Sequence, residues 1–209
     1  MTQPKKPDLA RRVRRLRRAE LPIDTIGLAR YLLGKTLVHD LPQGRLSGRI
    51  VETEAYPVGD AAGHAFTGFS RANQTLFLQR GHAYVRFTYG SCWLTNVSSE
   101  VPGIGAGVLI RALEPLEGIA RMERNRGTAV LRDLARGPGR LSVAMEIDNR
   151  FDGVDLCARE SALWLGSAPR PVGTIGVTVR IGITRAAHRK LRFYEKGSAF
   201  VSGPARLRR

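Results

Sequence analysis

Three residues with titratable side chains alternate along one stretch of the chain that favours β-structure. Glu52, Glu54 and Tyr56 are separated by β-favouring or small residues, and no strand breaker occurs before Pro57. Because side chains alternate across a strand, the two carboxylates and the phenol share one face. Burying such groups is costly unless they are paired or used. His64 follows on a Gly- and Ala-rich connection that can fold back, so a carboxylate, a phenol and an imidazole could form a catalytic pocket.

The elements around this motif are predicted to form a hairpin beside a short helix. Asp24 suits the N-cap of a helix that ends near Leu33. Its buried face is expected to hold Ile26, Leu28, Ala29 and Leu32. Residues 36–39 then favour a strand, residues 42–44 a turn, and residues 45–56 the returning strand. The motif therefore lies on the second arm of a hairpin.

A second hairpin is predicted further along the chain, with an aromatic residue at its tip. Residues 83–89 and 92–97 favour paired strands, and Tyr89 comes directly before Gly90, which permits a tight turn. On a basic protein, an aromatic side chain at a hairpin tip suggests insertion into a base stack. Packing of Tyr89 on Trp93 is the structural alternative.

Arg111 interrupts an apolar strand that is predicted over residues 107–113. An arginine in such a strand needs a partner or a ligand, because an unpaired buried charge is costly. An ion pair with Glu52 would give Arg111 a structural role, whereas a ligand would give it a functional one.

The segment after this strand is predicted to be mainly helical. Pro115 suits the first position of a helix that runs to about Asn125. Residues 128–135 favour a second helix, and residues 137–140 could open a third, where backbone N–H groups beside Arg140 could receive a DNA phosphate. Short strands are predicted at residues 162–165, 177–183 and 191–193. Together these elements indicate an α+β fold, a single compact domain with a curved antiparallel β-sheet and flanking helices.

The charge of the chain favours a polyanionic partner. The 209 residues carry a net charge of +16, much of it from arginine, and the pI is about 11.2. Arginine grips phosphate at two points and stacks on bases, so nucleic acid is the expected partner, with a generally arginine-rich proteome as the alternative. Residues 1–18 hold eight basic residues and one acid, Asp8. They are expected to form a flexible arm that binds phosphates, ahead of one domain over residues 19–209.

The rest of the composition argues against several classes of protein. Cys92 and Cys157 have neither CxxC nor metal-ligand spacing, which favours a reducing compartment over a disulfide scaffold or a zinc site. No apolar run approaches the ~20 residues of a membrane span. The basic N-terminus lacks the apolar core of a secretion signal. We expect a monomer in the cytoplasm, associated with the nucleoid, or in the nucleus.

Five short blocks between about residue 20 and residue 202 carry a family resemblance. They are Val51-Glu52-Thr53-Glu54-Ala55-Tyr56, Tyr89-Gly90 with Asn96, Arg111-Ala112-Leu113-Glu114-Pro115-Leu116-Glu117-Gly118, Gly137-Pro138 with Leu141, and Leu191-Arg192-Phe193-Tyr194. In this order they resemble the alkyladenine (3-methyladenine) DNA glycosylase family of the AAG/MPG type. An ordered series of blocks is far more specific than any one block. The resemblance implies the same compact α+β domain, with a positively charged face around a base pocket.

The resemblance also implies an activity. Such a protein would hydrolyse the N-glycosidic bond of alkylated or deaminated purines in double-stranded DNA, such as 3-methyladenine, hypoxanthine and ethenoadenine, in base excision repair. Glu54 would be the catalytic base, because a carboxylate can accept a proton from water and stabilise an oxocarbenium-like sugar. Arg111 would belong to the water- and phosphate-facing site. No lysine in the blocks could form a Schiff base, so a monofunctional enzyme is expected, with no metal or organic cofactor.

The implied recognition of the base needs a flipped nucleotide, because the bond to be cut is inaccessible inside the duplex. Tyr56 and His64 would hold the flipped base, and Asn96 would reject bases with an extra exocyclic amine, such as guanine. Tyr89 would fill the space left in the stack.

One position departs from the family pattern. The family usually has a tyrosine two residues after the tyrosine matched by Tyr84, and this ring completes an aromatic sandwich with Tyr56 and His64. This chain has Arg86. We expect Arg86 to share a strand face with Tyr84 and to stack on the base in place of the ring, unless the local match is shifted. The preferred damaged base is therefore left open.

Other interpretations fit parts of the pattern. A non-catalytic nucleic-acid-binding domain explains the charge and the aromatic residues but gives no reason for Glu54. A sugar hydrolase could pair Glu52 with Glu54, but neighbours on one strand face rarely flank a bond from both sides as that chemistry requires. Glutamates on the solvent face of a half-exposed strand are the structural alternative.

Overall fold

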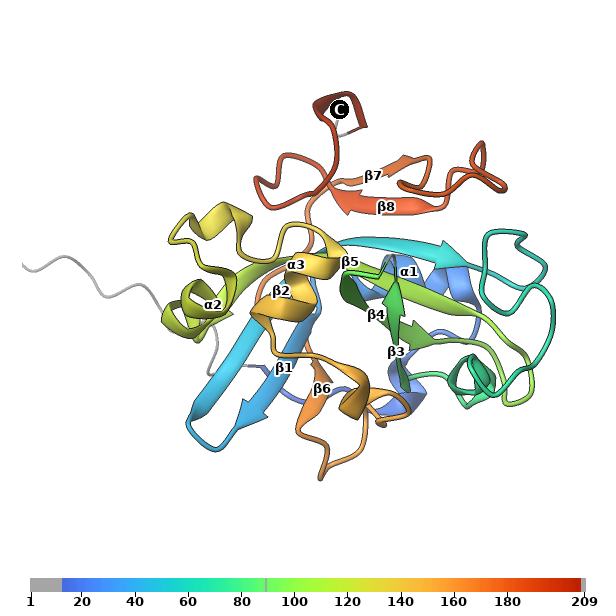
Figure 1. The fold of residues 1–209 in the computed structure, drawn as a ribbon, viewed down its shortest axis with the longest axis horizontal. Helices are drawn as coiled ribbons and strands as arrows, with labels where there is room; N and C mark the ends of the chain where they lie inside the picture. The colour runs from blue at the N-terminus through green and yellow to red at the C-terminus, as the bar shows by residue number, and fades with distance from the viewer. Residues whose placement is uncertain (1–12, 89, 208–209) are drawn as a thin grey trace, which may run out of the picture.

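The structure is a computed structural model that describes residues 13–88 and 90–207 (Figure 1). Within these residues, eight strands form one antiparallel sheet flanked by helices. The strands are β1 Thr36–Leu41, β2 Gly44–Tyr56, β3 Ala83–Thr88, β4 Cys92–Ser98, β5 Gly107–Glu117, β6 Leu163–Gly166, β7 Ile175–Thr178 and β8 Arg192–Glu195. The α-helices are α1 Thr25–Leu32, α2 Ile119–Arg126 and α3 Pro138–Ala144. Short 3-10 turns, η2 to η6, lie at Arg18–Glu20, Gln74–Phe77, Leu131–Asp133, Asn149–Phe151 and Ala205–Leu207. The predicted α+β class is confirmed.

The sheet is organised around β2. In the strand order β3-β4-β5-β2-β1-β6, β2 pairs with β1 over its first half and with β5 over nearly all of its length. β8 pairs with β2 at residues 52–54, and β7 pairs with β8. Every residue of β2 from 46 to 55 is buried. Glutamates on a solvent-exposed strand face are therefore ruled out, and the buried carboxylates need partners.

A β-bulge reverses the two faces of β2 beside the glutamates. The register against β5 shifts on both sides of Glu52. Ile50 before the shift and Ala55 after it both pack in the main hydrophobic core, while Val51 packs in a smaller cluster. A bulge inserts one extra residue and re-aims the side chains that follow, and bulges are common beside active sites. Thr53 then faces α1, where its hydroxyl donates to the carbonyl of Ala29 at 2.8 Å.

The helix before β1 forms as its sequence predicts. Asp24 is the N-cap of α1, and its carboxylate accepts from the backbone N–H of Gly27 at 2.6 Å. Leu28, Ala29 and Leu32 are buried against the sheet. The prediction that Ile26 is buried is wrong, since its side chain is 38% exposed and Thr25 takes the inner position.

The helix predicted to start at Pro115 begins later. β5 continues through Pro115 to Glu117, and α2 starts at Ile119 after Gly118 adopts a positive φ of 72°. Pro115 is opposite Gly48, at a register shift between β5 and β2. A proline lacks the N–H that a regular ladder needs, and an irregular position in a strand tolerates that loss.

The helix predicted over residues 128–135 is reduced to the 3-10 turn η4. The backbone here supports β5 instead, because the N–H of Leu113 donates to the carbonyl of Ala135 at 3.1 Å and Arg136 bridges to Ala112. The strand predicted over residues 177–183 also ends early, at Thr178, because the chain then leaves the sheet. By contrast, the predicted helix start at residues 137–140 is confirmed as α3.

The boundary of the N-terminal arm differs from the prediction. Residues 1–12 lie outside the described residues, but residues 13–18 are docked on the domain. Leu16 is buried, its N–H donates to the carbonyl of Leu165 at 2.8 Å, and Arg15 bridges to Gly166. Arg18 pairs with Asp155. A flexible arm that extends to residue 18 is therefore wrong for residues 13–18.

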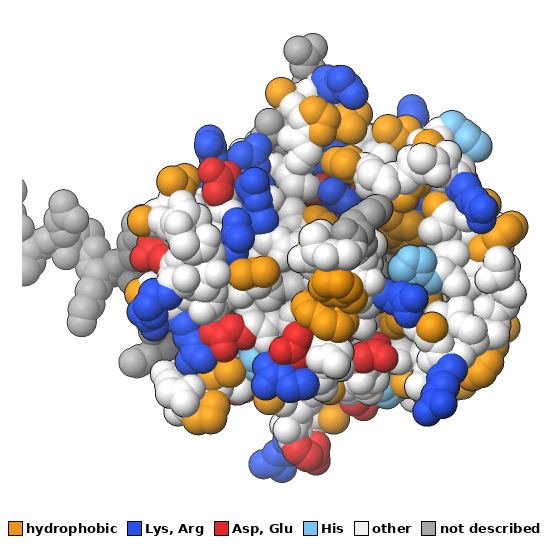
Figure 2. All heavy atoms as spheres, in the orientation of Figure 1, with side chains coloured by type: hydrophobic (Ala, Val, Ile, Leu, Met, Phe, Trp, Pro, Cys, Tyr) orange, Lys and Arg blue, Asp and Glu red, His pale blue; other side chains and the backbone are white. Residues whose placement is uncertain are grey.

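Lys and Arg side chains are spread over much of the surface that Figure 2 shows, as the net charge requires. No helix in the described part of the chain is long and apolar enough to cross a membrane.

Candidate active site

A cavity of about 140 Å³ lies where β2 ends, between the loop that follows β2 and the β3–β4 hairpin. The end of β2 contributes Tyr56 and the loop contributes His64. The hairpin contributes Tyr84 and Asn96, and Ile183 from the segment after β7 closes another side. A planar aromatic ligand fits walls of this kind, which combine aromatic rings with a few polar groups.

The surroundings of His64 orient its ring and favour the neutral imidazole. Its Nδ1 lies 3.1 Å from the hydroxyl of Tyr84, and the two rings meet edge to face at a centroid distance of 5.9 Å. Burial, helped by the charge of Arg86, lowers the pKa of His64. The amide of Asn73 donates to the backbone carbonyl of His64 at 2.9 Å and fixes the loop. A neutral imidazole can both donate and accept a hydrogen bond in the cavity.

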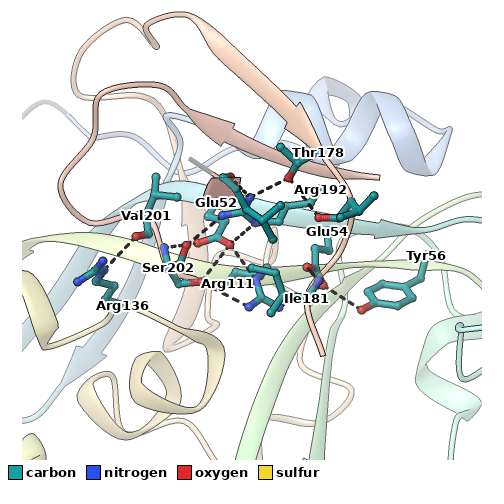
Figure 3. Close-up of polar contacts among 12 residues, drawn as sticks. Glu52, Glu54, Tyr56, Arg111, Arg136, Thr178, Ile181, Arg192, Val201 and Ser202 are labelled. Atoms are coloured by element: carbon teal, nitrogen blue, oxygen red, sulfur yellow. Dashed lines mark hydrogen bonds and ion pairs between the residues drawn. The ribbon is translucent and has the colours of Figure 1, made fainter. Parts of the chain in front are cut away.

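Glu54 is fully buried beside this cavity, with three donors around its carboxylate (Figure 3). The Tyr56 hydroxyl donates at 3.0 Å, the backbone N–H of Ile181 at 2.8 Å, and Nη1 of Arg111 lies 3.2 Å away. Burial raises the pKa of Glu54, and Arg111 opposes that shift only in part. Glu54 does not itself line the cavity; the ring of Tyr56, which does, connects the carboxylate to it.

Glu52 lies on the same face and is paired with two arginines. It accepts from Nε of Arg111 at 2.8 Å and from Nε of Arg192 at 2.7 Å. The backbone N–H of Ser202 donates at 2.6 Å and its hydroxyl at 3.0 Å. Burial opposes the charge, but the two arginines outweigh it and lower the pKa of Glu52. The ion pair expected between Arg111 and Glu52 is confirmed, and Arg111 bridges both glutamates.

Sequence reasoning missed a second buried cluster behind Tyr56. The guanidinium of Arg180 lies 4.5 Å from the centre of the Tyr56 ring and donates to the carbonyl of Ala55 at 2.9 Å. It also pairs with Asp60 at 2.9 Å, and the side chains of both residues are fully buried. Arg189 contacts the same carboxylate at 2.9 Å. This cluster joins the loop that carries His64 to the segment that carries Ile181 and Ile183.

A signal for this cluster was present in the sequence. Arg180 lies in the apolar run Val177–Ile183, so the argument that Arg111 needs a buried partner applies to it equally. Asp60 was inconspicuous in a Gly/Ala loop, and only the fold shows that it is the partner.

Two further predicted residues lie elsewhere. Arg86 is exposed, its guanidinium donates to the carbonyl of Ala72 at 3.1 Å, and it does not line the cavity, contrary to the expectation that it faces the pocket. The reason is that its long side chain is directed to the carbonyl of Ala72 and to solvent. Arg140 is half-exposed on α3, near Asp133. Tyr89 lies outside the described residues, so its insertion into DNA stays a prediction.

Within the described residues no group of three or more His, Cys, Asp or Glu side chains is arranged to hold a metal ion.

Comparison with known proteins identifies the family of the chain. The family described as methylpurine-DNA glycosylase (MPG) matches residues 20–199. A protein of Mesorhizobium japonicum, provisionally named a 3-methyladenine DNA glycosylase, is 64% identical over 91% of each chain. A protein of Paraburkholderia phytofirmans with the same provisional name is 56% identical over 92% of this chain and 90% of its own. Another, from Rubrobacter xylanophilus, is 44% identical over 84% of this chain and 91% of its own. The chain belongs to the methylpurine-DNA glycosylase family.

Proposed function

We propose that this protein excises alkylated and deaminated purines from double-stranded DNA with a water activated by Glu54, and leaves the DNA strand uncut. As a member of its family the chain is a DNA glycosylase, a hydrolase that repairs alkylated bases. What is proposed beyond the family is the substrate range, the mechanism and the residues that carry it. The partner is duplex DNA in the cytoplasm or nucleus, and the protein acts as a monomer.

The observation that carries the proposal is the position of Glu54. Its carboxylate is held by Arg111, by the hydroxyl of Tyr56 and by the N–H of Ile181, immediately behind the wall of the cavity. A base in the cavity, against Tyr56 and His64, brings its own glycosidic bond next to Glu54. Three fixed donors leave the carboxylate little freedom, which favours one geometry of attack.

The reaction is a hydrolysis in which each group has one task. The oxygen of water forms a bond to C1′ of the sugar, and a proton of that water passes to Glu54. The bond from C1′ to the base nitrogen breaks, and its electron pair leaves with the base. The anionic carboxylate also stabilises the positive charge that develops on the sugar. Among the described residues, the lining of the cavity includes no lysine, which supports hydrolysis without a Schiff base to the sugar and without strand cleavage.

Recognition of the base requires that the nucleotide leaves the helix. Flipping costs a few kcal/mol and is easiest at damaged or mispaired sites, which contributes to selectivity. We infer that Tyr89 fills the gap in the stack and that Asn96 excludes guanine through its amide. Asn96 already donates to the carbonyl of Tyr84 at 3.1 Å, which fixes its orientation at the cavity wall.

Release of free base tests the proposal directly. Duplexes with a single 3-methyladenine, hypoxanthine or ethenoadenine are incubated with the protein, and free base and strand breaks are measured separately. Free base without strand cleavage is expected. A non-catalytic DNA-binding domain, the second candidate, would bind the same duplexes and release nothing.

A further inference from the structure

Two arginines between α2 and α3 and a third on α3 converge on one carboxylate, that of Asp133. Guanidinium nitrogens of Arg132, Arg136 and Arg140 lie 3.7, 3.3 and 3.9 Å from Oδ1 of Asp133. These four residues are called the Asp133 cluster. In the part of the chain that the structure describes, no other carboxylate forms an ion pair with these arginines. One negative charge therefore faces three positive charges, and two are left without a counter-charge.

The uncompensated charge is accessible and has a further neighbour. The side chains of Arg132 and Arg140 are 57% and 52% exposed, so their remaining N–H groups can reach a ligand in solution. Burial and the charge of Arg140 lower the pKa of Arg126, at the end of α2, which places another guanidinium close by. Figure 2 shows Lys and Arg side chains gathered over this segment. By contrast, Arg150 forms a one-to-one pair with Asp148.

The cluster is connected to the glutamates by a short path. Nε of Arg136 donates to the carbonyl of Val201 at 3.0 Å, and the next residue, Ser202, binds Glu52. Figure 3 shows Arg136 and Tyr56 at opposite sides of this group, with Glu52 and Glu54 between them. The Asp133 cluster therefore adjoins the buried group that holds Glu52 and Glu54.

We propose that the Asp133 cluster binds phosphodiester groups of the DNA strand that carries the flipped nucleotide, an inference that rests on the proposed function. Arginine presents a planar fork of N–H groups that matches two phosphate oxygens. Asp133 holds the guanidiniums together against their mutual repulsion, and a phosphate supplies the missing negative charge. Phosphates bound here fix the register of the strand while the cavity selects the base.

Single substitutions at the two exposed arginines test the site. Arg132→Ala and Arg140→Ala remove one charge each and little buried surface, and Arg150→Ala is the matched control, because it removes an arginine that is 73% exposed from a neutral pair. Affinity for undamaged duplex is measured as a function of salt. In each cluster variant, the slope of the logarithm of the binding constant against the logarithm of the salt concentration should be smaller by about one unit, as expected for one lost phosphate contact. Binding should also weaken severalfold. Arg150→Ala should change neither.

Neutral phosphate analogues locate the contact. Lesion duplexes with one methylphosphonate at successive positions around the damaged nucleotide are bound to the wild type and to Arg140→Ala. The wild type should lose affinity at one or two positions, and Arg140→Ala should be insensitive at one of them. The proposal is overturned if a methylphosphonate at each position weakens binding of the wild type and of Arg140→Ala equally. It is also overturned if Arg132→Ala and Arg140→Ala show the same salt dependence of binding as Arg150→Ala.

The binding assays separate this inference from the proposed function. The wild type could release no base from any lesion duplex while the salt dependence of binding and the methylphosphonate series give the expected results. In that case the phosphate site stands and the proposed function fails. If excision is intact while the cluster variants bind DNA like the control, only the phosphate site is wrong.

Discussion

Glu52 and Glu54 lie two residues apart on the same face of β2, and both are fully buried, but their surroundings differ in charge. Glu52 faces the guanidiniums of Arg111 and Arg192, whereas Glu54 shares only Arg111 and otherwise accepts from neutral donors. Burial opposes the charge of both. The pKa of Glu52 is lowered and that of Glu54 is raised. Glu52 has two guanidinium partners and Glu54 has one, and this difference accounts for the opposite directions of their pKa shifts.

The largest expected effect is on the rate of excision by Glu54→Gln. The amide keeps the size of the side chain but cannot accept a proton from water, so single-turnover excision should fall by roughly 10²- to 10⁴-fold. Binding to lesion DNA should be retained, because Glu54 does not line the cavity. If folded Glu52→Gln protein loses turnover while Glu54→Gln keeps it, the roles of the two glutamates are reversed.

Glu52→Gln should act mainly on stability. The substitution leaves Arg192 and part of Arg111 buried without a full counter-charge, and breaking a buried ion pair in this way costs about 3–5 kcal/mol. Denaturant unfolding of the two variants measures the difference. Glu54→Gln should be much less destabilising, because Arg111 still has Glu52. Equal free energies of unfolding for the two variants would show that Glu52 does not contribute more to stability than Glu54.

The pH dependence should also differ between the two glutamates. Excision needs ionised Glu54, so the rate should fall by about tenfold per pH unit below a midpoint above the usual glutamate pKa of 4.5. Because the folded pKa of Glu54 is raised, its contribution to stability is present at low pH and is lost as pH rises through that value. The contribution of Glu52, whose folded pKa is lowered, is present above 4.5 and is lost as pH falls through its folded value. The excision rate and the fraction of folded protein are measured together as functions of pH. A midpoint of the excision rate below pH 4.5 would contradict the raised pKa of Glu54.

The local parts of this site could be predicted from the sequence. Strand alternation places Glu52, Glu54 and Tyr56 together, and the cost of a buried charge predicts a partner for Arg111. Asp24 marks the start of α1, because capping is a local hydrogen bond.

Contacts between distant segments could not be predicted in the same way. Asp60 and Arg180 are 120 residues apart in sequence, and no local pattern pairs them. The bulge that re-aims Glu52 arises from the register against β5, which depends on two strands at once. Pro115 favours a helix start by its own propensity, and pairing with β2 overrides that propensity.

A smaller effect on rate is expected at Arg180. Arg180→Met removes the cation behind the Tyr56 ring and the pair with Asp60, so Tyr56 and Glu54 should lose alignment and excision should fall about tenfold. Arg180→Lys keeps the cation near the ring and should restore part of the rate. Arg189→Met is the matched control, since Arg189 shares Asp60 but is 37% exposed. Single-turnover rates and thermal unfolding are measured together. Equal losses for Met and Lys at position 180, or a loss of the same size in the control, would mean that Arg180 does not act through Tyr56.

The smallest expected effect concerns Arg86. Its substitution distinguishes stacking of the guanidinium on the damaged base from a contact with the DNA backbone. Stacking on the base would make the charge repel cationic 3-methyladenine, and Arg86→Tyr would then favour that base over neutral hypoxanthine by about 0.5–2 kcal/mol. The observed side chain is exposed and bonded to Ala72, outside the cavity lining. We therefore expect Arg86 to face the DNA backbone, so Arg86→Tyr should weaken binding to every substrate alike and lower the salt slope by about one unit. The ratio of excision rates for the two bases should change by less than about twofold, whereas stacking on the base predicts a change of about 2- to 30-fold, the equivalent of 0.5–2 kcal/mol. A larger shift toward 3-methyladenine would show that Arg86 enters the cavity when the base is bound.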